Sequence, residues 1–252
     1  MNSKINKIIG VIPARYESSR FPGKPLADIC GKPMIWWVYQ QCKKVTELNE
    51  IYVATDDLRI KEVCDTYNMK CIMTSISHNT HIHRVHEISE LISSDYYVVI
   101  CGDEPLIEIE NIKCMIPRGI SNDSYITCTC RYFTEPAEVI DPANTKVVTN
   151  PAEKCVFLSR SPIPFPYKTL NFKYKKLVGV ECYNKKALDY FVSLPKGYLE
   201  SIEDVTLQRF LENGIAITCK LIESDSLSVD TPKDLEIVRE KISNNKIKNN
   251  GK

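Results

Sequence analysis

The sequence contains no apolar run that approaches the roughly 18 consecutive residues needed to span a membrane. It also carries almost no net charge, because 33 lysine and arginine residues are balanced by 32 aspartate and glutamate residues to leave +1. This balance excludes a nucleic-acid-binding protein that relies on a broad basic face, and it excludes adsorption to an anionic membrane. The N-terminus lacks an apolar segment followed by a small-residue cleavage site, so we expect a cytoplasmic protein.

The eleven cysteines include no Cys-x2-Cys pair. Most are single residues within apolar runs, and only Cys128 and Cys130 lie close together in the sequence. On a strand these two side chains would point to the same face. The spacing therefore argues against a zinc ribbon, and we expect buried, reduced thiols.

Short apolar runs alternate with amphipathic segments along the chain, which is typical of an α/β fold with a parallel sheet. With 252 residues and 43% apolar content, the chain can form one domain with a substantial core, which we assign to 1–242. The tail, 243–252, is polar, and we expect it to be disordered. We expect strands over 8–12, 51–57, 70–74, 96–100, 125–132, 145–148, 177–183 and 215–222, and helices over 33–45, 58–67, 185–194, 202–212 and 231–242.

The loop after the first expected strand, PARYESSRFPGKPL at 13–26, is the most informative stretch. Within ten residues it contains three cations and two hydroxyls, namely Arg15, Arg20, Lys24, Ser18 and Ser19. A strand, a cationic loop and a helix in succession commonly bind phosphate at the carboxyl end of a parallel strand. The loop would suit a triphosphate, although a solvent-exposed loop with incidental charges would have the same composition.

Asp103 follows the buried strand expected at 96–100, and Gly102 before it allows a close approach of the backbone. A carboxylate in this place could hold a divalent cation against the phosphates of a nucleotide. The plain alternative is a turn residue with no ligand.

The loop motif PARYxSxRxPGKPL resembles the signature of the CMP-Kdo synthetases, the cytidylyltransferases that activate the sugar acid Kdo. It is neither the glycine-rich Gly-x-Gly-x-Arg loop of other nucleotidyltransferases nor the lysine P-loop of ATPases. The resemblance extends from about residue 9 to residue 238. Its further motifs occur in the family order: VATDD at 53–57, MTS at 73–75 followed by His78, GDEPL at 102–106, SRSPIP at 159–164 and SVDTPKDLE at 228–236.

This resemblance implies a nucleotide-diphospho-sugar transferase-like α/β fold. Such a fold has a Rossmann-like, mostly parallel sheet with helices on both faces and a smaller antiparallel region for acceptor binding and dimerisation. It also implies a homodimeric enzyme that transfers CMP from CTP to an acceptor, with Mg2+ as cofactor and release of pyrophosphate. Asp103 and Asp230 would hold the magnesium ion and, with Arg15 and Lys24, would act in catalysis. The residues implied for nucleotide binding are Pro13, Ala14, Arg15, Ser18, Lys24, Thr74, Ser75, His78, Asn79 and Asp103.

The chain departs from the family pattern at three places. HNTHIHR at 78–84 replaces His-x-Ser-Gly-Thr-Asp-Arg, Cys101 replaces a glutamine, and LVGVE at 177–181 replaces His-Ile-Gly-Ile-Tyr. In that family the lost glutamine, histidine and tyrosine line the sugar-acid side of the pocket. Their loss would leave hydroxyl groups of Kdo unpaired, at about 1–3 kcal/mol each. We therefore expect an acceptor other than Kdo.

A phosphate or phosphonate acceptor is already ionised near neutral pH and needs less help from a base than an anomeric hydroxyl does. His83, Arg84 and Arg160 could bind such an anion, while Glu181 could pair with an ammonium group. An amino-acid phosphate would satisfy both, which resembles the CTP:phosphoglutamine cytidylyltransferases of capsular phosphoramidate pathways, whose acceptor is L-glutamine phosphate. Two alternatives stay open, a CMP-Kdo synthetase with a rebuilt pocket and a non-catalytic relative that binds CTP.

All four histidines lie within 78–86. Their spacing matches neither the i, i+4 pair of helical zinc sites nor a zinc finger. We interpret them as hydrogen-bonded or acceptor-facing side chains rather than as metal ligands.

Overall fold

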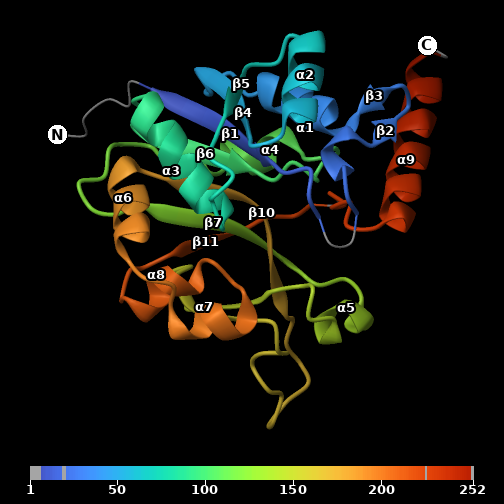
Figure 1. Cartoon of the computed structure of the whole chain (residues 1–252). Coiled ribbons are helices and arrows are strands. Elements are labelled where there is room, and N and C mark those ends of the chain that lie inside the picture. Colours follow the sequence, from blue (N-terminus) through green and yellow to red (C-terminus); the bar gives the residue numbers. More distant parts are fainter. Residues whose placement is uncertain (1–6, 19–20, 225, 251–252) are drawn as a thin grey trace.

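The computed structural model describes residues 7–18, 21–224 and 226–250, which are built around a mixed, nine-stranded sheet (Figure 1). Seven strands follow the order β11-β7-β10-β6-β1-β4-β5, and β8 and β9 form a branch that pairs with β10. Their bounds are β1 Ile8–Ala14, β4 Glu50–Thr55, β5 Cys71–Met73, β6 Tyr96–Ile100, β7 Ile126–Tyr132, β8 Lys146–Thr149, β9 Cys155–Ser159, β10 Lys175–Tyr183 and β11 Thr218–Leu221. This sheet confirms the expected α/β fold class.

The strand order reverses at β1, and this reversal creates the crevice used by the site. From β1 the chain continues to β4 and β5 on one side, and it then returns to β6 on the other side. β1 is parallel to both β4 and β6, whereas β10 is antiparallel to β6 and to β7. Ligands of open α/β sheets bind at such a switch point, beyond the carboxyl ends of the strands.

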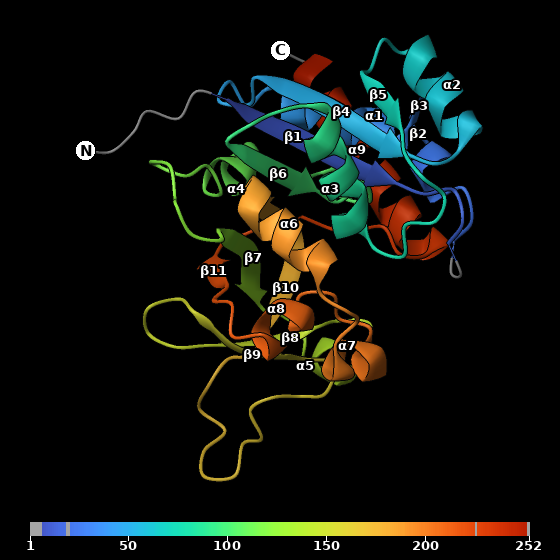
Figure 2. The ribbon, with the colours of Figure 1, turned by 60° about the vertical axis from the view of Figure 1, so that its left-hand side comes forward.

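Helices cover both faces of the sheet because successive side chains of a strand point in opposite directions. Ile8 and Ile12 of β1 pack with α1 (Met34–Lys43), α2 (Leu58–Thr66) and α4 (Ile109–Lys113). Ile9 and Val11 pack on the other face with α3 (His81–Leu91) and α6 (Lys185–Ser193). Figure 2 shows α3 and α6 together on that face. Both helical layers therefore hold β1 rigidly between them.

The C-terminal helix α9 (Pro232–Asn250) lies beside the small hairpin of β2 (Asp28–Ile29) and β3 (Lys32–Pro33), as Figure 1 shows. Ile29, Val229 and Val238 belong to the cluster that joins them, and the Arg239 side chain donates to the Asp28 carbonyl. This packing brings the start of α9 to the loop that follows β1.

The helices expected over 33–45, 58–67, 185–194 and 231–242 are present, but the helix expected over 202–212 is wrong. The chain instead forms α7 (Tyr198–Glu203) and α8 (Gln208–Glu212), and Asp204 between them has φ 51° and ψ 44°. The break lets the Arg209 guanidinium contact the Glu200 carboxylate at 2.7 and 2.8 Å. In a continuous helix nine residues would separate the two by about 13 Å.

The sequence reasoning missed α3, the short helices α4 and α5 (Pro136–Ile140), and strand β9. Thr80 caps α3 by accepting from the His83 N–H, and Ile82, Val85 and Ile88 bury one face. A threonine cap followed by this apolar spacing is the signal that could have revealed it. α9 includes 243–250, most of the tail expected to be disordered, where the absence of proline permits a helical backbone. The single domain over 1–242 stays a prediction.

The described cysteines are all free thiols, as expected, and most are buried or half-buried, whereas Cys101 and Cys114 are exposed. No helix in the described part of the chain has the length and apolar character needed to cross a bilayer.

The Arg209–Glu200 pair gives a test of the α7–α8 arrangement. Both side chains are at most 5% exposed, so Glu200→Ala leaves a buried guanidinium without its partner. We expect a loss of about 3–5 kcal/mol in the free energy of unfolding, measured by urea titration. The control is Glu240→Ala on α9, which removes an exposed carboxylate and should change the free energy of unfolding by less than about 0.5 kcal/mol. Glu212 is also exposed but accepts a hydrogen bond from the Leu199 N–H, so it is not used. An equal effect of both substitutions would contradict this account.

Candidate active site

The loop after β1 folds back on itself before it enters the crevice. The Gly23 N–H donates to the Tyr16 carbonyl at 2.8 Å, and Gly23 adopts φ 70°. This left-handed backbone favours glycine, and it starts the 3-10 helix η1 (Lys24–Leu26). The Ser18 Oγ accepts from the Phe21 N–H at 3.4 Å, while Ser19 and Arg20 lie outside the described residues. The turn at Gly23 is what directs Lys24 toward the end of β6.

Lys24 joins two carboxylates that are far apart in the sequence. Its Nζ lies 2.6 Å from Asp103 Oδ2 and 3.4 Å from Asp230 Oδ1. Burial disfavours the charged amine, but Asp103 and, less strongly, Asp230 raise the pKa of Lys24. The structure thus assembles three of the four residues expected to act in catalysis into one ion cluster. The fourth, Arg15, is exposed directly after β1, and its charge acts on His81, which pairs with Glu181.

The two aspartates fit the magnesium ion that the resemblance implies. Both are partly exposed carboxylates that contact the same ammonium group, so their oxygens converge on one small volume. Hard divalent cations prefer carboxylate oxygens and are commonly held by one or two carboxylates together with substrate phosphates. Asp103 and Asp230 are therefore the residues that could hold the ion.

Asp230 is positioned by the loop that precedes α9. The Val229 N–H donates to the Asp103 carbonyl at 2.8 Å, which fixes the loop directly on the end of β6. Asp234 accepts from the backbone of Asp230 and Thr231, and the Thr231 Oγ1 accepts from the Asp234 N–H in return. Thr231 is thus the helix cap, and the Asp230 side chain stays available to the site.

Glu104 is a residue whose role the sequence reasoning missed. Its buried carboxylate accepts from the Gly179 N–H at 3.1 Å, from Ser228 at 3.2 Å and from Ser226 at 3.3 Å. Burial, and next the charge of Asp103, raise the pKa of Glu104 to about 7. A Cβ on Gly179 would lie 2.3 Å from Glu104 Oε1, so any larger residue there would displace this carboxylate. Glu104 therefore ties the loop that carries Asp230 to strand β10.

A cavity of about 470 Å³ opens beside this cluster. Asp103, Glu104 and Asp230 line one part of it, and β10 from Lys176 to Glu181 forms a wall. Cys101, Leu177 and Glu181, which replace polar residues of the family pattern, all line the cavity. The altered positions thus meet in one space next to the predicted metal ligands.

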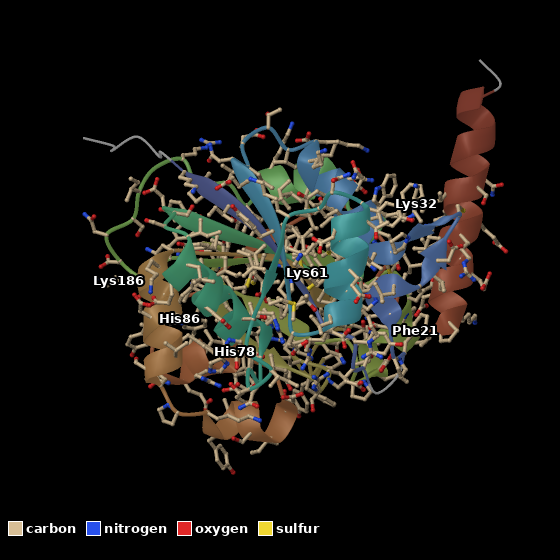
Figure 3. All side chains as sticks on the ribbon, turned by 45° about the horizontal axis from the view of Figure 1, so that its top comes forward. Phe21, Lys32, Lys61, His78, His86 and Lys186 are labelled. Atoms are coloured by element: carbon tan, nitrogen blue, oxygen red, sulfur yellow. The ribbon has the colours of Figure 1, made fainter. Side chains whose placement is uncertain are left out.

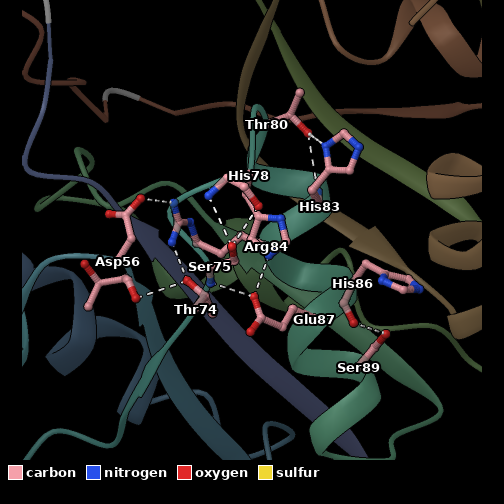
Figure 4. Close-up of polar contacts among 12 residues, drawn as sticks. Asp56, Thr74, Ser75, His78, Thr80, His83, Arg84, His86, Glu87 and Ser89 are labelled. Atoms are coloured by element: carbon pink, nitrogen blue, oxygen red, sulfur yellow. Dashed lines mark hydrogen bonds and ion pairs between the residues drawn. The ribbon is translucent and has the colours of Figure 1, made fainter. Parts of the chain in front are cut away.

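The nucleotide-binding residues that the resemblance implies between Thr74 and Asn79 lie on the segment after β5, and α3 holds this segment in place (Figure 4). Arg84, only 1% exposed, donates to Thr74 Oγ1 and to Asp56 Oδ2. Glu87 accepts from the Ser75 N–H and pairs with His78. Arg84 therefore lies apart from the cavity, and its contacts favour a positioning role over direct contact with an acceptor.

Glu181, expected to meet an ammonium group, already has two partners. His81 Nε2 lies 2.7 Å from Glu181 Oε2, and the Tyr183 hydroxyl donates to the same oxygen at 2.6 Å. Burial opposes the charged imidazole and Arg15 also disfavours it, yet Glu181 raises the pKa of His81. Burial likewise opposes ionisation of Glu181, but His81 and Tyr183 lower its pKa. An internal ion pair thus occupies the place of the lost tyrosine.

The other two expected acceptor residues lie away from the 470 Å³ cavity. The Arg160 guanidinium donates to backbone carbonyls of Glu203, Asp204 and Pro142, so it fastens the segment after β9. His83 Nδ1 lies 2.8 Å from Thr80 Oγ1 and borders a separate cavity of about 250 Å³. The structure therefore does not bring Arg84, Arg160 and His83 together with Glu181.

The remaining histidine contacts agree with the interpretation that these side chains are hydrogen-bonded. Among the described residues, the one group of three or more potential metal-ligating side chains is His86, Glu90 and Asp189. The Lys185 ammonium contacts both of these carboxylates, which places a cation there already. Figure 3 shows His78 and His86 on one side of the molecule and Phe21, from the loop after β1, on the other.

Comparison with known proteins gives a consistent result over nearly the whole chain. A family model described as cytidylyltransferase matches residues 9–222. The 3-deoxy-manno-octulosonate cytidylyltransferase of Escherichia coli is 36% identical over 236 residues, covering 93% of this chain and 96% of the relative. An 8-amino-3,8-dideoxy-manno-octulosonate cytidylyltransferase of Shewanella piezotolerans is 38% identical over 239 residues, covering 92% and 97%. A solved CMP:2-keto-3-deoxy-manno-octonic acid synthetase complexed with CTP has a TM-score of 0.86 at 34% identity, covering 95% of this chain and 100% of that one.

The His81–Glu181 pair predicts a pH-dependent contribution to stability. The pKa of His81 is raised above its ordinary value of 6.5, so the charged imidazole stabilises the fold fully at pH values below 6.5. This stabilisation is lost as the pH rises through the folded-state pKa. The pKa of Glu181 is lowered from its ordinary value of 4.5, so its carboxylate contributes to stability at pH values above 4.5. This contribution is lost as the pH falls through the folded-state pKa. The melting temperature of wild type should therefore exceed that of His81→Gln most between about pH 5 and 6.5, and the difference should shrink by pH 9. A constant difference from pH 5 to pH 9 would contradict the ion pair.

Proposed function

This chain belongs to the cytidylyltransferase family that includes the CMP-Kdo synthetases, and we propose that it transfers CMP from CTP to an anionic acceptor other than Kdo. One arrangement carries the proposal. The Lys24–Asp103–Asp230 cluster lies beside a cavity whose wall contains Cys101, Leu177 and Glu181 in place of the residues expected for a sugar acid. The nucleotide side of the site thus follows the family, while the acceptor side differs.

The chain's own charges support in-line displacement at the α-phosphorus of CTP. Arg15 and Lys24 would neutralise the triphosphate, and Lys24 would stabilise the pyrophosphate as the bond from the α-phosphorus to its bridging oxygen breaks. Asp103 and Asp230 would hold Mg2+, which when bound supplies a further positive charge to the phosphates. The acceptor oxygen, held in the cavity, forms the new bond to the α-phosphorus. Positioning and electrostatics suffice, so no side chain needs to act as a nucleophile.

L-glutamine phosphate is the acceptor that we favour, which would place the enzyme in a capsular phosphoramidate pathway. Its phosphate is ionised near neutral pH and needs no general base. Two alternatives remain, namely synthesis of CMP-Kdo or an amino-Kdo product in a rebuilt pocket, and CTP binding without catalysis. Retention of Lys24 with both aspartates in one cluster favours an active enzyme over a binding protein. We also propose a cytoplasmic homodimer, whose size light scattering would measure.

Removal of charge from the ion cluster should abolish most turnover. We expect Lys24→Ala and Asp103→Asn each to lower kcat for pyrophosphate release by about 100- to 1,000-fold, because each removes electrostatic stabilisation of the transition state. The matched controls are Lys61→Ala and Asp65→Asn, which disrupt an exposed ion pair on α2. Wild-type kcat in Lys24→Ala would contradict the proposed role of the cluster.

The acceptor is tested by pyrophosphate release from CTP and Mg2+ over a panel of Kdo, 8-amino-3,8-dideoxy-manno-octulosonate, a sialic acid, L-glutamine phosphate and simple phosphonates. We expect turnover with L-glutamine phosphate or a phosphonate and none with Kdo. Efficient turnover with either octulosonate would show that the three altered motifs do not exclude sugar acids. Tight CTP binding without any turnover would support the binding-protein alternative.

A further inference from the structure

The cavity has a second polar cluster, which lies away from the aspartates and which the proposed reaction does not use. It consists of Arg131 on β7, Glu138 on α5 and Lys176 on β10, all of which line the cavity. Lys176 is 8% exposed, and its Nζ lies 3.1 Å from Glu138 Oε1. Two cations and one carboxylate therefore share this end of the cavity.

Two atoms of the cluster have unused hydrogen-bonding capacity. In the described residues the buried Arg131 Nε has no acceptor, and the buried Glu138 Oε2 has no donor. A buried polar atom without a partner costs about 1–3 kcal/mol, so each such atom needs an explanation, and a bound group is one of them. Here the unpaired donor and the unpaired acceptor belong to two residues that line the same cavity.

The charges around Lys176 also favour an added anion. Burial, and next the neighbouring charge of Arg131, lower the pKa of Lys176, whereas Glu138 and Glu104 raise it. A carboxylate bound between Lys176 and Arg131 would relieve the repulsion between the two cations and would provide the acceptor that Arg131 Nε lacks. Glu138 would remain available for a positively charged donor.

The separation between this cluster and the ion cluster indicates the length of the acceptor. Gly179 contacts Glu104, the neighbour of Asp103, and lies three residues beyond Lys176 along β10. At about 3.3 Å per residue, the backbones of Lys176 and Gly179 are about 10 Å apart along the strand. An acceptor that reaches both ends must be elongated, with its reacting oxygen at one end and its charged group at the other.

We propose that Arg131, Lys176 and Glu138 form a distal acceptor subsite that binds a zwitterionic end group. The carboxylate of an α-amino acid head group contacts Arg131 and Lys176, and its ammonium group donates to Glu138. This inference rests on the proposed function, which assigns the reacting oxygen to the other end of the acceptor. It also makes Glu138, rather than Glu181, the partner of the ammonium group. A sugar acid such as Kdo has no ammonium group, so it can offer Glu138 only neutral hydroxyl donors and no opposite charge.

The test compares two elongated phosphonates that differ only in the ammonium group, 2-amino-5-phosphonopentanoate and 5-phosphonopentanoate. Calorimetry measures their binding to the full-length protein with Mg2+ and a CTP analogue whose α,β-bridging oxygen is replaced by methylene, which prevents transfer. We expect wild type to bind the amino compound at least 10-fold more tightly. Glu138→Gln should make the two affinities equal, and Arg131→Gln should weaken both at least 10-fold, with partial recovery in Arg131→Lys.

Arg118→Gln is the matched control, since Arg118 is exposed and does not line the cavity. It should leave both affinities unchanged, and the melting temperature of each variant shows whether it is folded. Equal wild-type affinities for the two probes, or an Arg131→Gln variant that is folded and binds normally, would overturn the subsite.

Turnover separates this inference from the proposed function. Substituting CTP for the analogue measures transfer of CMP to the amino compound, and we expect Arg131→Gln to raise its KM more than it lowers kcat. Binding that depends on Arg131 and Glu138 but yields no CMP transfer would support the subsite and contradict the function. Transfer whose KM is unchanged by Arg131→Gln and Glu138→Gln would support the function and overturn the subsite.

Discussion

The contact of one lysine with two aspartates organises the site. Asp103 and Asp230 carry like charges in a single crevice, an arrangement that requires a cation between them. Lys24 supplies that cation, and the three residues come from the loop after β1, the end of β6 and the start of α9. Three features bring these segments together: the reversal of strand order at β1, the packing of α9 on the β2–β3 hairpin, and the hydrogen bond from the Val229 N–H to the Asp103 carbonyl. The same oxygens and ammonium group then suit a cation and a triphosphate.

The rest of the site consists of residues that position the site and of residues that line the cavity wall. Arg84 and Glu87 fix the segment 74–78 through hydrogen bonds with Thr74 and Ser75, and Glu104 fixes the loop before Asp230 through Ser226 and Ser228. These residues position other residues of the site and need not touch a substrate themselves. The wall of the cavity differs in kind, because Cys101 and the His81–Glu181 pair change which groups an acceptor meets. In the proposed function the ion cluster therefore keeps the residues of the family, whereas an acceptor meets different groups on β10 and at Cys101.

Local sequence patterns predicted the sheet and the ion cluster because both depend on short segments. Apolar runs located eight of the strands but neither β9 nor the β2–β3 hairpin, and motifs around Lys24, Asp103 and Asp230 located the residues that the structure brings together. Tertiary contacts decided what failed. The Arg209–Glu200 pair favours a break in the helix that amphipathic spacing alone predicts to be continuous. The burial of Arg84 against Asp56 could not be predicted from the segment 78–84, because the partner is distant in the sequence. Glu104, Arg131 and Glu138 could not be recognised either, because their significance comes from partners distant in sequence or from partners that are missing.

The most direct measurement of the central claim is anomalous diffraction at the manganese edge from crystals grown with Mn2+ and CTP. The account predicts a manganese peak between the carboxylates of Asp103 and Asp230, in contact with CTP phosphate, and Lys24 Nζ moved from Asp103 to the phosphates. CTP bound elsewhere, or a manganese peak that neither aspartate contacts, would contradict it.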